Sequence, residues 1–136
     1  QCLMLEEFLA REFKAGRISS DSFTSEAKTI HLHGHCFQKA LAGTTASETA
    51  LSLPQNYTVK TIPSGCCGMA GSFGYEKEHF EVSNKIGELI LFPAVRKAKE
   101  NDFIAAPGTS CRHQIHDGTK RTALHPAQIL LKALRD

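Results

Sequence analysis

The sequence predicts an α/β domain built on a mostly parallel sheet of about four strands, with helices on both faces. Strand-like and helix-like segments alternate at least three times along the chain, which is typical of parallel sheets. The chain has 136 residues, of which 41% are hydrophobic and 22% charged, enough for one buried core. Four cysteines each follow a strand-like segment, so we expect the cysteine-bearing loops at the carboxyl edge of the sheet.

The first element expected is an amphipathic helix at residues 3–14, whose apolar positions repeat at helical spacing: Met4, Leu5, Phe8 and Leu9. A polar connection follows at residues 16–28. This change in composition predicts two parts, an N-terminal helix with its connection at residues 1–28 and a cysteine-rich α/β domain at 29–136.

The first strand is expected at residues 28–35, where β-branched and apolar residues lead to Gly34. A short helix at 36–43 should end at Gly43, and a second at 45–53 has Thr44 or Thr45 as its N-cap. The next strand, 57–65, should end at Pro63 and Gly65.

The second half continues the alternation. A helix is expected at 77–91, and Pro93 should open another that runs to Lys99. A third strand at 102–110 leads to a turn or two of helix closed by Gly118. A fourth short strand at 121–126 precedes a final helix with Pro126 at its first position.

Composition excludes several classes of protein. A net charge of +2 without a basic stripe argues against nucleic-acid binding. No apolar run approaches the roughly 20 residues that span a bilayer, and no signal peptide is visible. Five cysteines, two of them adjacent, fit a disulfide scaffold poorly and favour a reducing, cytoplasmic location. Gln1 is no initiator methionine, so we expect a piece of a longer chain.

Four thiols should converge. Cys36 follows the first strand, Cys66 and Cys67 the second, and Cys111 the third, so all four reach the edge where such sheets bind ligands. Thiolates, not thiols, bind metal, so a metal site here would have to tolerate several negative charges. Cys2, in the amphipathic segment, is expected to act as a small packing residue.

The surroundings of these cysteines suit an anionic centre. Cys36 and Cys111 lie near helix starts, which favour anions, and Lys39 and Arg112 are close in sequence. Glycines recur every third residue around the cysteine pair, where they let backbone N–H groups approach a sulfur or another anion: Gly65, Gly68, Gly71 and Gly74. A plain loop or a phosphate cradle are the alternatives, although the Lys-Ser/Thr ending of a P-loop is absent.

The histidines differ in their expected roles. His33, His35 and His113 are candidates for an extra metal ligand or for a group that supports the ligands. One of His31 and His33 could instead be an ordinary buried histidine of the strand. His79 is expected at the surface and His125 in a structural role.

A resemblance sharpens these expectations. The stretches "HGHCFQKAL", "SGCCGMAGSFGYE", "APGTSCRHQI" and "LHP" together resemble the C-terminal cysteine-rich CCG domain of FAD-linked oxidases, found in glycolate oxidase iron–sulfur subunits, D-2-hydroxyacid dehydrogenases and heterodisulfide reductases. The resemblance runs from about His31 to the end of the chain. It implies an iron–sulfur cluster, or zinc in some members, held by the four cysteines named above.

The resemblance also implies partners: an FAD domain and a ferredoxin-like domain in the rest of a parent flavoprotein, and a membrane-associated electron acceptor reached through that parent. The fragment alone would then not be catalytic. Two departures concern the cluster type. The family pattern ends in Cys-x-x-Cys, whereas Gly108 stands three residues before Cys111, and Phe37 stands where another histidine is expected.

Three functions therefore compete. The leading one is an iron–sulfur electron-transfer module of a 2-hydroxyacid oxidoreductase. The second is a zinc-binding or metal-free interaction module. The third, a thiol–disulfide enzyme that uses Cys66 and Cys67 or Cys111, lacks the Cys-x-x-Cys redox motif.

Overall fold

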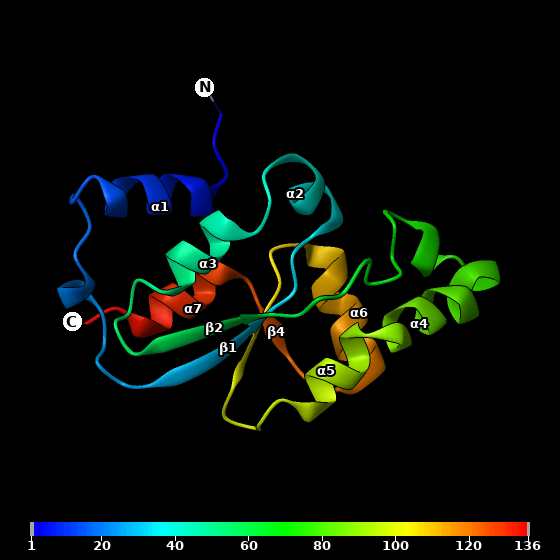
Figure 1. Ribbon diagram of the computed structural model, residues 1–136. Coiled ribbons are helices and arrows are strands. Elements are labelled where there is room, and N and C mark those ends of the chain that lie inside the picture. The colour runs from blue at the N-terminus through cyan, green and yellow to red at the C-terminus, as the bar shows by residue number, and fades with distance from the viewer. Residues whose placement is uncertain (1, 136) are drawn as a thin grey trace.

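A four-stranded, wholly parallel sheet forms the centre of the protein. The computed structural model describes residues 2–135, and its strand order is β2-β1-β3-β4 (Figure 1). The expected α/β class, with about four strands, is confirmed. The strands are β1 (Lys28–Leu32), β2 (Tyr57–Thr61), β3 (Phe103–Ala105) and β4 (Ala123–Leu124).

Seven α-helices connect and flank these strands in the described part of the chain. They are α1 (Leu5–Lys14), α2 (Cys36–Leu41), α3 (Thr45–Leu51), α4 (Phe80–Leu89), α5 (Leu91–Lys97), α6 (Thr109–Thr119) and α7 (Pro126–Ala133). Three short 3-10 turns are η1 (Ser20–Ser22), η2 (Phe73–Tyr75) and η3 (Lys77–His79). None of the helices in residues 2–135 has the length and apolar character needed to cross a membrane.

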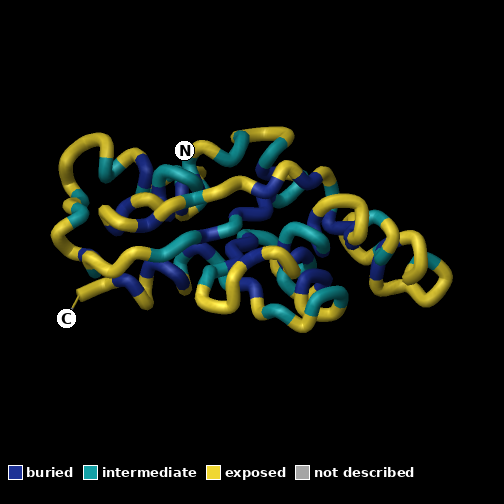
Figure 2. The backbone as a smooth tube through the Cα atoms, turned by 60° about the horizontal axis from the view of Figure 1, so that its bottom comes forward, coloured by how far each residue is buried: buried dark blue, intermediate teal, exposed yellow. Residues whose placement is uncertain are grey.

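Helices cover both faces of the sheet, as the sequence predicts. On one face, Ile30 and Leu32 of β1 pack with apolar residues of α3 and α7. On the other, Ile104 of β3 packs with Phe92 of α5 and Ile115 of α6. The alternation of side chains along each strand sends neighbouring residues to opposite cores. Figure 2 shows the buried segments along the middle of the molecule, with exposed chain around them.

The parallel ladder continues past the ends of the named strands. The N–H of His33 donates to the carbonyl of Ala105 at 2.8 Å, and that of Ile62 donates to Leu32 at 2.8 Å. The N–H of Ala106 donates to Leu124 at 2.9 Å. These bonds hold the segments that follow the strands side by side at one edge of the sheet.

Two helix boundaries that the sequence predicts from glycine and proline differ in the structure. Gly43, with φ of 72°, does follow the end of α2. Gly118, however, does not end α6, which runs to Thr119 and is followed by Lys120 at φ of 61°. A Cβ on Gly118 would lie 2.3 Å from the Phe92 ring, so this glycine permits close helix packing instead. Pro93 is the third residue of α5, not its first.

All four strands are shorter than expected: β1, β2 and β3 end at Leu32, Thr61 and Ala105, not at residues 35, 65 and 110. Strand β4 has two residues where six were expected, and α3 stops two residues earlier than predicted, at Leu51. Cys2 precedes α1 and is exposed, so the expectation that it packs as a small apolar residue is wrong. The helix starts later because Met4 is its N-cap, with its N–H donating to Glu7 Oε2 at 2.8 Å.

Candidate metal centre

The four expected cysteines line one cavity at the carboxyl edge of the sheet. The cavity has a volume of about 740 Å³, and Cys2 does not contribute to it. Its lining residues are His35, Cys36, Phe37, Cys66, Cys67, Ala70, Gly71, Ser110 and Cys111. The thiols therefore meet from three separate segments, the start of α2, the loop after β2 and the first turn of α6, as expected from the order of strands and cysteines.

The thiols differ in depth. Cys67 and Cys111 are 2% and 1% exposed and belong to the core under α5 and α6. Cys36 and Cys66 are half-buried. Cys36 is the first residue of α2, and Cys111 is the third residue of α6. The buried pair thus lies at the inner end of the cavity, with the other two thiols nearer to solvent.

Proximity makes the buried pair electrostatically unequal. The hydrogen bond from the Cys111 thiol, helped by the nearby His33 imidazole, lowers the pKa of Cys67 to about 4. The same pairing raises the pKa of Cys111 far above its usual range, and burial adds to that rise. Burial, followed by the contact with Cys66, raises the pKa of Cys36. One thiol of the buried pair is therefore already ionised at neutral pH, and a bound cation would favour ionisation of the other thiols as well.

The glycine-rich loop is shaped around the cysteine pair. The N–H of Gly68 donates to Cys66 Sγ at 3.2 Å. Gly68 has φ of 101°, and a Cβ there would lie 2.2 Å from the carbonyl oxygen of Ser83. The side-chain amide of Gln114 donates to the same carbonyl and to Ser83 Oγ, at 3.2 and 2.9 Å. Gly65, in contrast, is exposed with open space around it.

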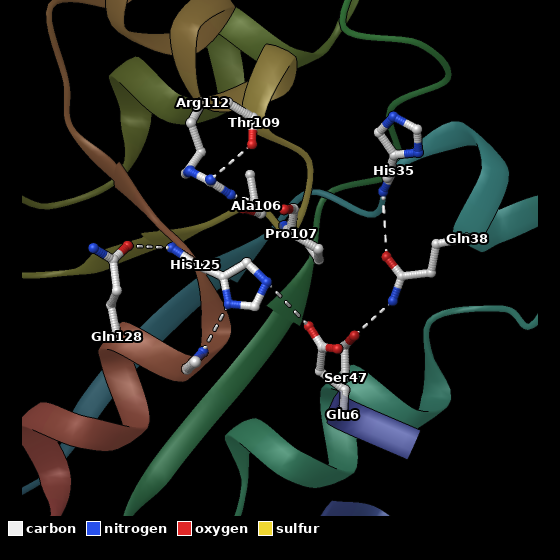
Figure 3. Close-up of polar contacts among 11 residues, drawn as sticks. Glu6, His35, Gln38, Ser47, Ala106, Pro107, Thr109, Arg112, His125 and Gln128 are labelled. Atoms are coloured by element: carbon white, nitrogen blue, oxygen red, sulfur yellow. Dashed lines mark hydrogen bonds and ion pairs between the residues drawn. The ribbon is translucent and has the colours of Figure 1, made fainter. Parts of the chain in front are cut away.

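The expected cations support the loops. Lys39 Nζ donates to the carbonyls of Ser64 and Gly65, directly before the cysteine pair. Arg112 donates to the carbonyls of Ala106 and Pro107 and to Thr109 Oγ1 (Figure 3). Neither cation lines the cavity. The charge of Lys39 nevertheless opposes the rise in the pKa of Cys36.

The three candidate histidines have separate positions. His33 is fully buried, and one of its ring nitrogens lies within 4.8 Å of the sulfurs of Cys67 and Cys111. His35 lines the cavity, and its Nδ1 accepts from the N–H of Phe37 at 3.2 Å. His113 does not line the cavity, and its Nδ1 lies 2.8 Å from the hydroxyl of Tyr75.

The other histidines have structural contacts. His125 caps α7, with Nδ1 accepting from the N–H of Ala127 at 3.1 Å. Its Nε2 faces Glu6 Oε1 at 3.9 Å, beside a second cavity of about 400 Å³ (Figure 3). His79 stacks on Phe73 with ring centroids 4.0 Å apart, and its side chain is 39% exposed, near the surface as expected.

Gly108 lies next to His35 and Cys111 and lines the second cavity. A Cβ on this residue would lie 3.1 Å from Cys111 Sγ and 2.5 Å from the His35 ring. A side chain at position 108 would therefore start beside the Cys111 thiol. The ring of His35 occupies the adjacent space.

Sequence reasoning missed Ser64 as part of the site. Its Oγ lies 2.7 Å from His33 Nδ1. The parallel pairing of Leu32 with Thr61 places the residues after β1 beside those after β2. The predicted pairing of these two strands could have indicated that Ser64 lies beside His33. A single serine in a loop, however, belongs to no recognisable motif.

Comparison with known proteins relates the chain to segments of larger dehydrogenases. It is 32% identical over 129 residues to D-2-hydroxyglutarate dehydrogenase of Escherichia coli K12, a match that covers 93% of this chain and 13% of the relative. It is 33% identical over 133 residues to the protein of that name from Pantoea ananatis, covering 97% of this chain and 12% of the relative.

A further relative belongs to a different dehydrogenase. One subunit of the anaerobic glycerol-3-phosphate dehydrogenase of Escherichia coli K12 is 28% identical over 104 residues, which cover 75% of this chain and 25% of the relative. The chain thus spans a quarter or less of each of these three proteins. No protein-family model matches the chain. No solved structure matches it either.

Proposed function

We propose that this chain is the iron–sulfur electron-transfer domain of an FAD-linked oxidoreductase that acts on a 2-hydroxy acid. The observation that carries the proposal is the meeting of Cys36, Cys66, Cys67 and Cys111 in one cavity. Four thiolates are the usual protein ligands of an iron–sulfur cluster. The similarity to dehydrogenase segments supports the redox assignment.

The residues present fit such a group. The cavity of about 740 Å³ has ample room, and its donors are thiols that bind iron once deprotonated. When bound, the cluster would supply one-electron redox chemistry. The chain itself would hold the group, donate the Gly68 N–H to Cys66 Sγ, and place the positive charges of Lys39 and Arg112 nearby.

The partners in this proposal are the flavin and ferredoxin-like domains of a longer parent protein, in the cytoplasm. Hydride removal from a 2-hydroxy acid would belong to the FAD of that parent. Electrons would leave through this domain towards a membrane-associated acceptor.

The proposal is tested in the full-length parent by replacing each of the four cysteines singly by serine. We expect flavin reduction by substrate to stay normal and flavin reoxidation to be lost, as measured by stopped-flow absorbance. Iron and acid-labile sulfide should be present in anaerobically prepared wild-type protein and depleted in the variants. Slow flavin reduction with normal reoxidation would instead assign the cysteines to substrate chemistry.

A zinc-binding module is the second candidate. It is favoured by one observation, the buried group of His33, Cys67 and Cys111, because zinc readily takes imidazole and thiolate ligands together. Zinc without iron or sulfide in the anaerobic protein would select this function over electron transfer.

A further inference from the structure

His33 has a buried polar atom without a partner. Its side chain is fully buried. Among the side chains described in residues 2–135, its Nε2 is one of three buried atoms without a hydrogen-bond partner. Burial of a polar group without compensation is costly. The Cys67 sulfur, whose pKa the His33 ring lowers, is one neighbour that this nitrogen can engage, and a metal ion held between the ring and the sulfurs is another.

Two sulfurs lie close to this imidazole. A ring nitrogen of His33 and the Sγ atoms of Cys67 and Cys111 all lie within 4.8 Å of one another. With metal–sulfur and metal–nitrogen bonds of about 2.3 and 2.0 Å, tetrahedral coordination separates ligand atoms by about 3.5–3.8 Å. Small side-chain movements would bring the three atoms to the spacing that one metal ion needs.

Ser64 engages the other nitrogen of the ring. Its Oγ lies 2.7 Å from His33 Nδ1. When Nδ1–H donates to this oxygen, the lone pair is on Nε2, which is then free to bind a metal. Metal-binding histidines commonly use their second nitrogen in this way. Lys39 Nζ donates a hydrogen bond to the carbonyl of Ser64 at 2.7 Å, which fixes the backbone of the residue that contacts His33.

We propose that His33 binds metal through Nε2, together with Cys67 and Cys111, so that the buried end of the centre has mixed nitrogen and sulfur ligation. The inference rests on the metal-binding part of the proposed function and is independent of electron transfer. A neutral imidazole adds a ligand without another buried negative charge.

Cobalt(II) alone, without sulfide, is the probe for the first test. Anaerobic, metal-free protein is titrated with Co²⁺ and followed by thiolate charge-transfer and ligand-field absorbance. We expect His33→Gln to weaken cobalt binding by at least about tenfold, and Ser64→Ala by about 10–100-fold, the usual effect of losing a group that orients a ligand. Unchanged affinity and spectrum in His33→Gln would overturn the assignment.

His31→Gln is the matched control. His31 lies on the same strand two residues earlier, and its Nε2 is 2.9 Å from Asp102 Oδ2. It contributes no atom to the group of three ligands. This variant should keep the cobalt affinity of the wild type.

A measurement on wild-type protein removes any dependence on how the variants fold. Pulsed electron paramagnetic resonance of the cobalt form, with histidine labelled by ¹⁵N, should show the strong coupling of a directly bound imidazole. Its absence overturns the inference while leaving a cysteine-held cluster intact. Conversely, strong coupling in a protein that takes up no iron and sulfide would keep the His33 assignment and reject the electron-transfer function.

Discussion

Two identical side chains, Cys67 and Cys111, differ in acidity because they share one proton. The pKa of Cys67 is lowered to about 4 by the Cys111 thiol and by His33, whereas the pKa of Cys111 is raised. This division was beyond sequence reasoning, which predicted that the thiols meet but not their depth or mutual contact. The role of loop residues without a motif, such as Ser64, could not be predicted from the sequence either.

The unequal pair predicts a pH dependence of stability in the metal-free protein. Between pH of about 4 and the ordinary thiol pKa of 9.0, Cys67 is ionised in the folded state and protonated in the unfolded state, so stability should rise with pH. Above 9.0, folded Cys111 keeps a proton that the unfolded chain loses, so stability should fall. Urea denaturation at a series of pH values measures this.

The control is a double variant, Cys67→Ser with Cys111→Ser. It should lose both the rise and the fall in this pH range while keeping contributions from other groups. An identical pH profile in the double variant and the wild type would contradict the prediction.

Gly68 gives a second prediction at this scale. Its φ of 101° and the carbonyl of Ser83, which would be 2.2 Å from a Cβ, leave no room for alanine. Gly68→Ala should destabilise the fold by about 1–3 kcal/mol through backbone strain alone, with displacement of Ser83 in addition. Chemical denaturation gives the value. Gly65→Ala, which has no atom within 4 Å of its Cβ, should cost far less.

Two helices have the same N-terminal capping motif, a His-x-x-Gln capping box. His35 with Gln38 starts α2, and His125 with Gln128 starts α7. In each, the histidine ring accepts a backbone N–H and the glutamine oxygen accepts the N–H of the histidine. Figure 3 shows the bond between histidine and glutamine in both boxes. The final helix was correctly expected to have Pro126 at its first position, but its histidine cap was not foreseen. Imidazole is an uncommon cap, and the usual signal is Ser, Thr, Asp or Asn.

The cap of α7 can be tested without touching the cysteines. Gln128→Ala removes the acceptor that lies 2.8 Å from the N–H of His125, and should cost about 0.5–2 kcal/mol of stability. Gln128→Glu keeps an acceptor and should preserve most of the stability. Equal losses in the two variants, measured by chemical denaturation, would show that packing and not capping determines the effect.

The sheet divides the molecule into two apolar cores of different character. Among the described residues, the core under α3 and α7 contains no cysteine, whereas the core under α5 and α6 includes Cys67 and Cys111. Alternation of strands and helices, together with Gly and Pro signals, was enough to predict this layered arrangement. The lengths of β4 and α6 were not predictable locally, because contacts with distant elements, such as Gly118 against Phe92, decide them.

Metal removal should therefore affect the two halves unequally. We expect metal-free protein to stay folded with a cooperative thermal transition, because the core under α3 and α7 does not depend on the cysteines. Hydrogen exchange should accelerate in α6 and the loop at residues 62–74, and change little in α3 and α7. Global loss of protection with chelator would contradict this, as would no change anywhere in a protein shown to have released its metal.

The contact between His35 and Gly108 has an evolutionary consequence. A cysteine at position 108 would have its Cβ 3.1 Å from Cys111 Sγ, but the same Cβ would lie 2.5 Å from the His35 ring. A lineage could therefore gain a thiol at this position only with an accompanying change at position 35 or a shift of that ring. The two sites should behave as an epistatic pair, in which the order of substitution matters. A small residue at position 35 would be the permissive first step, and Gly108→Cys would be tolerated only afterwards.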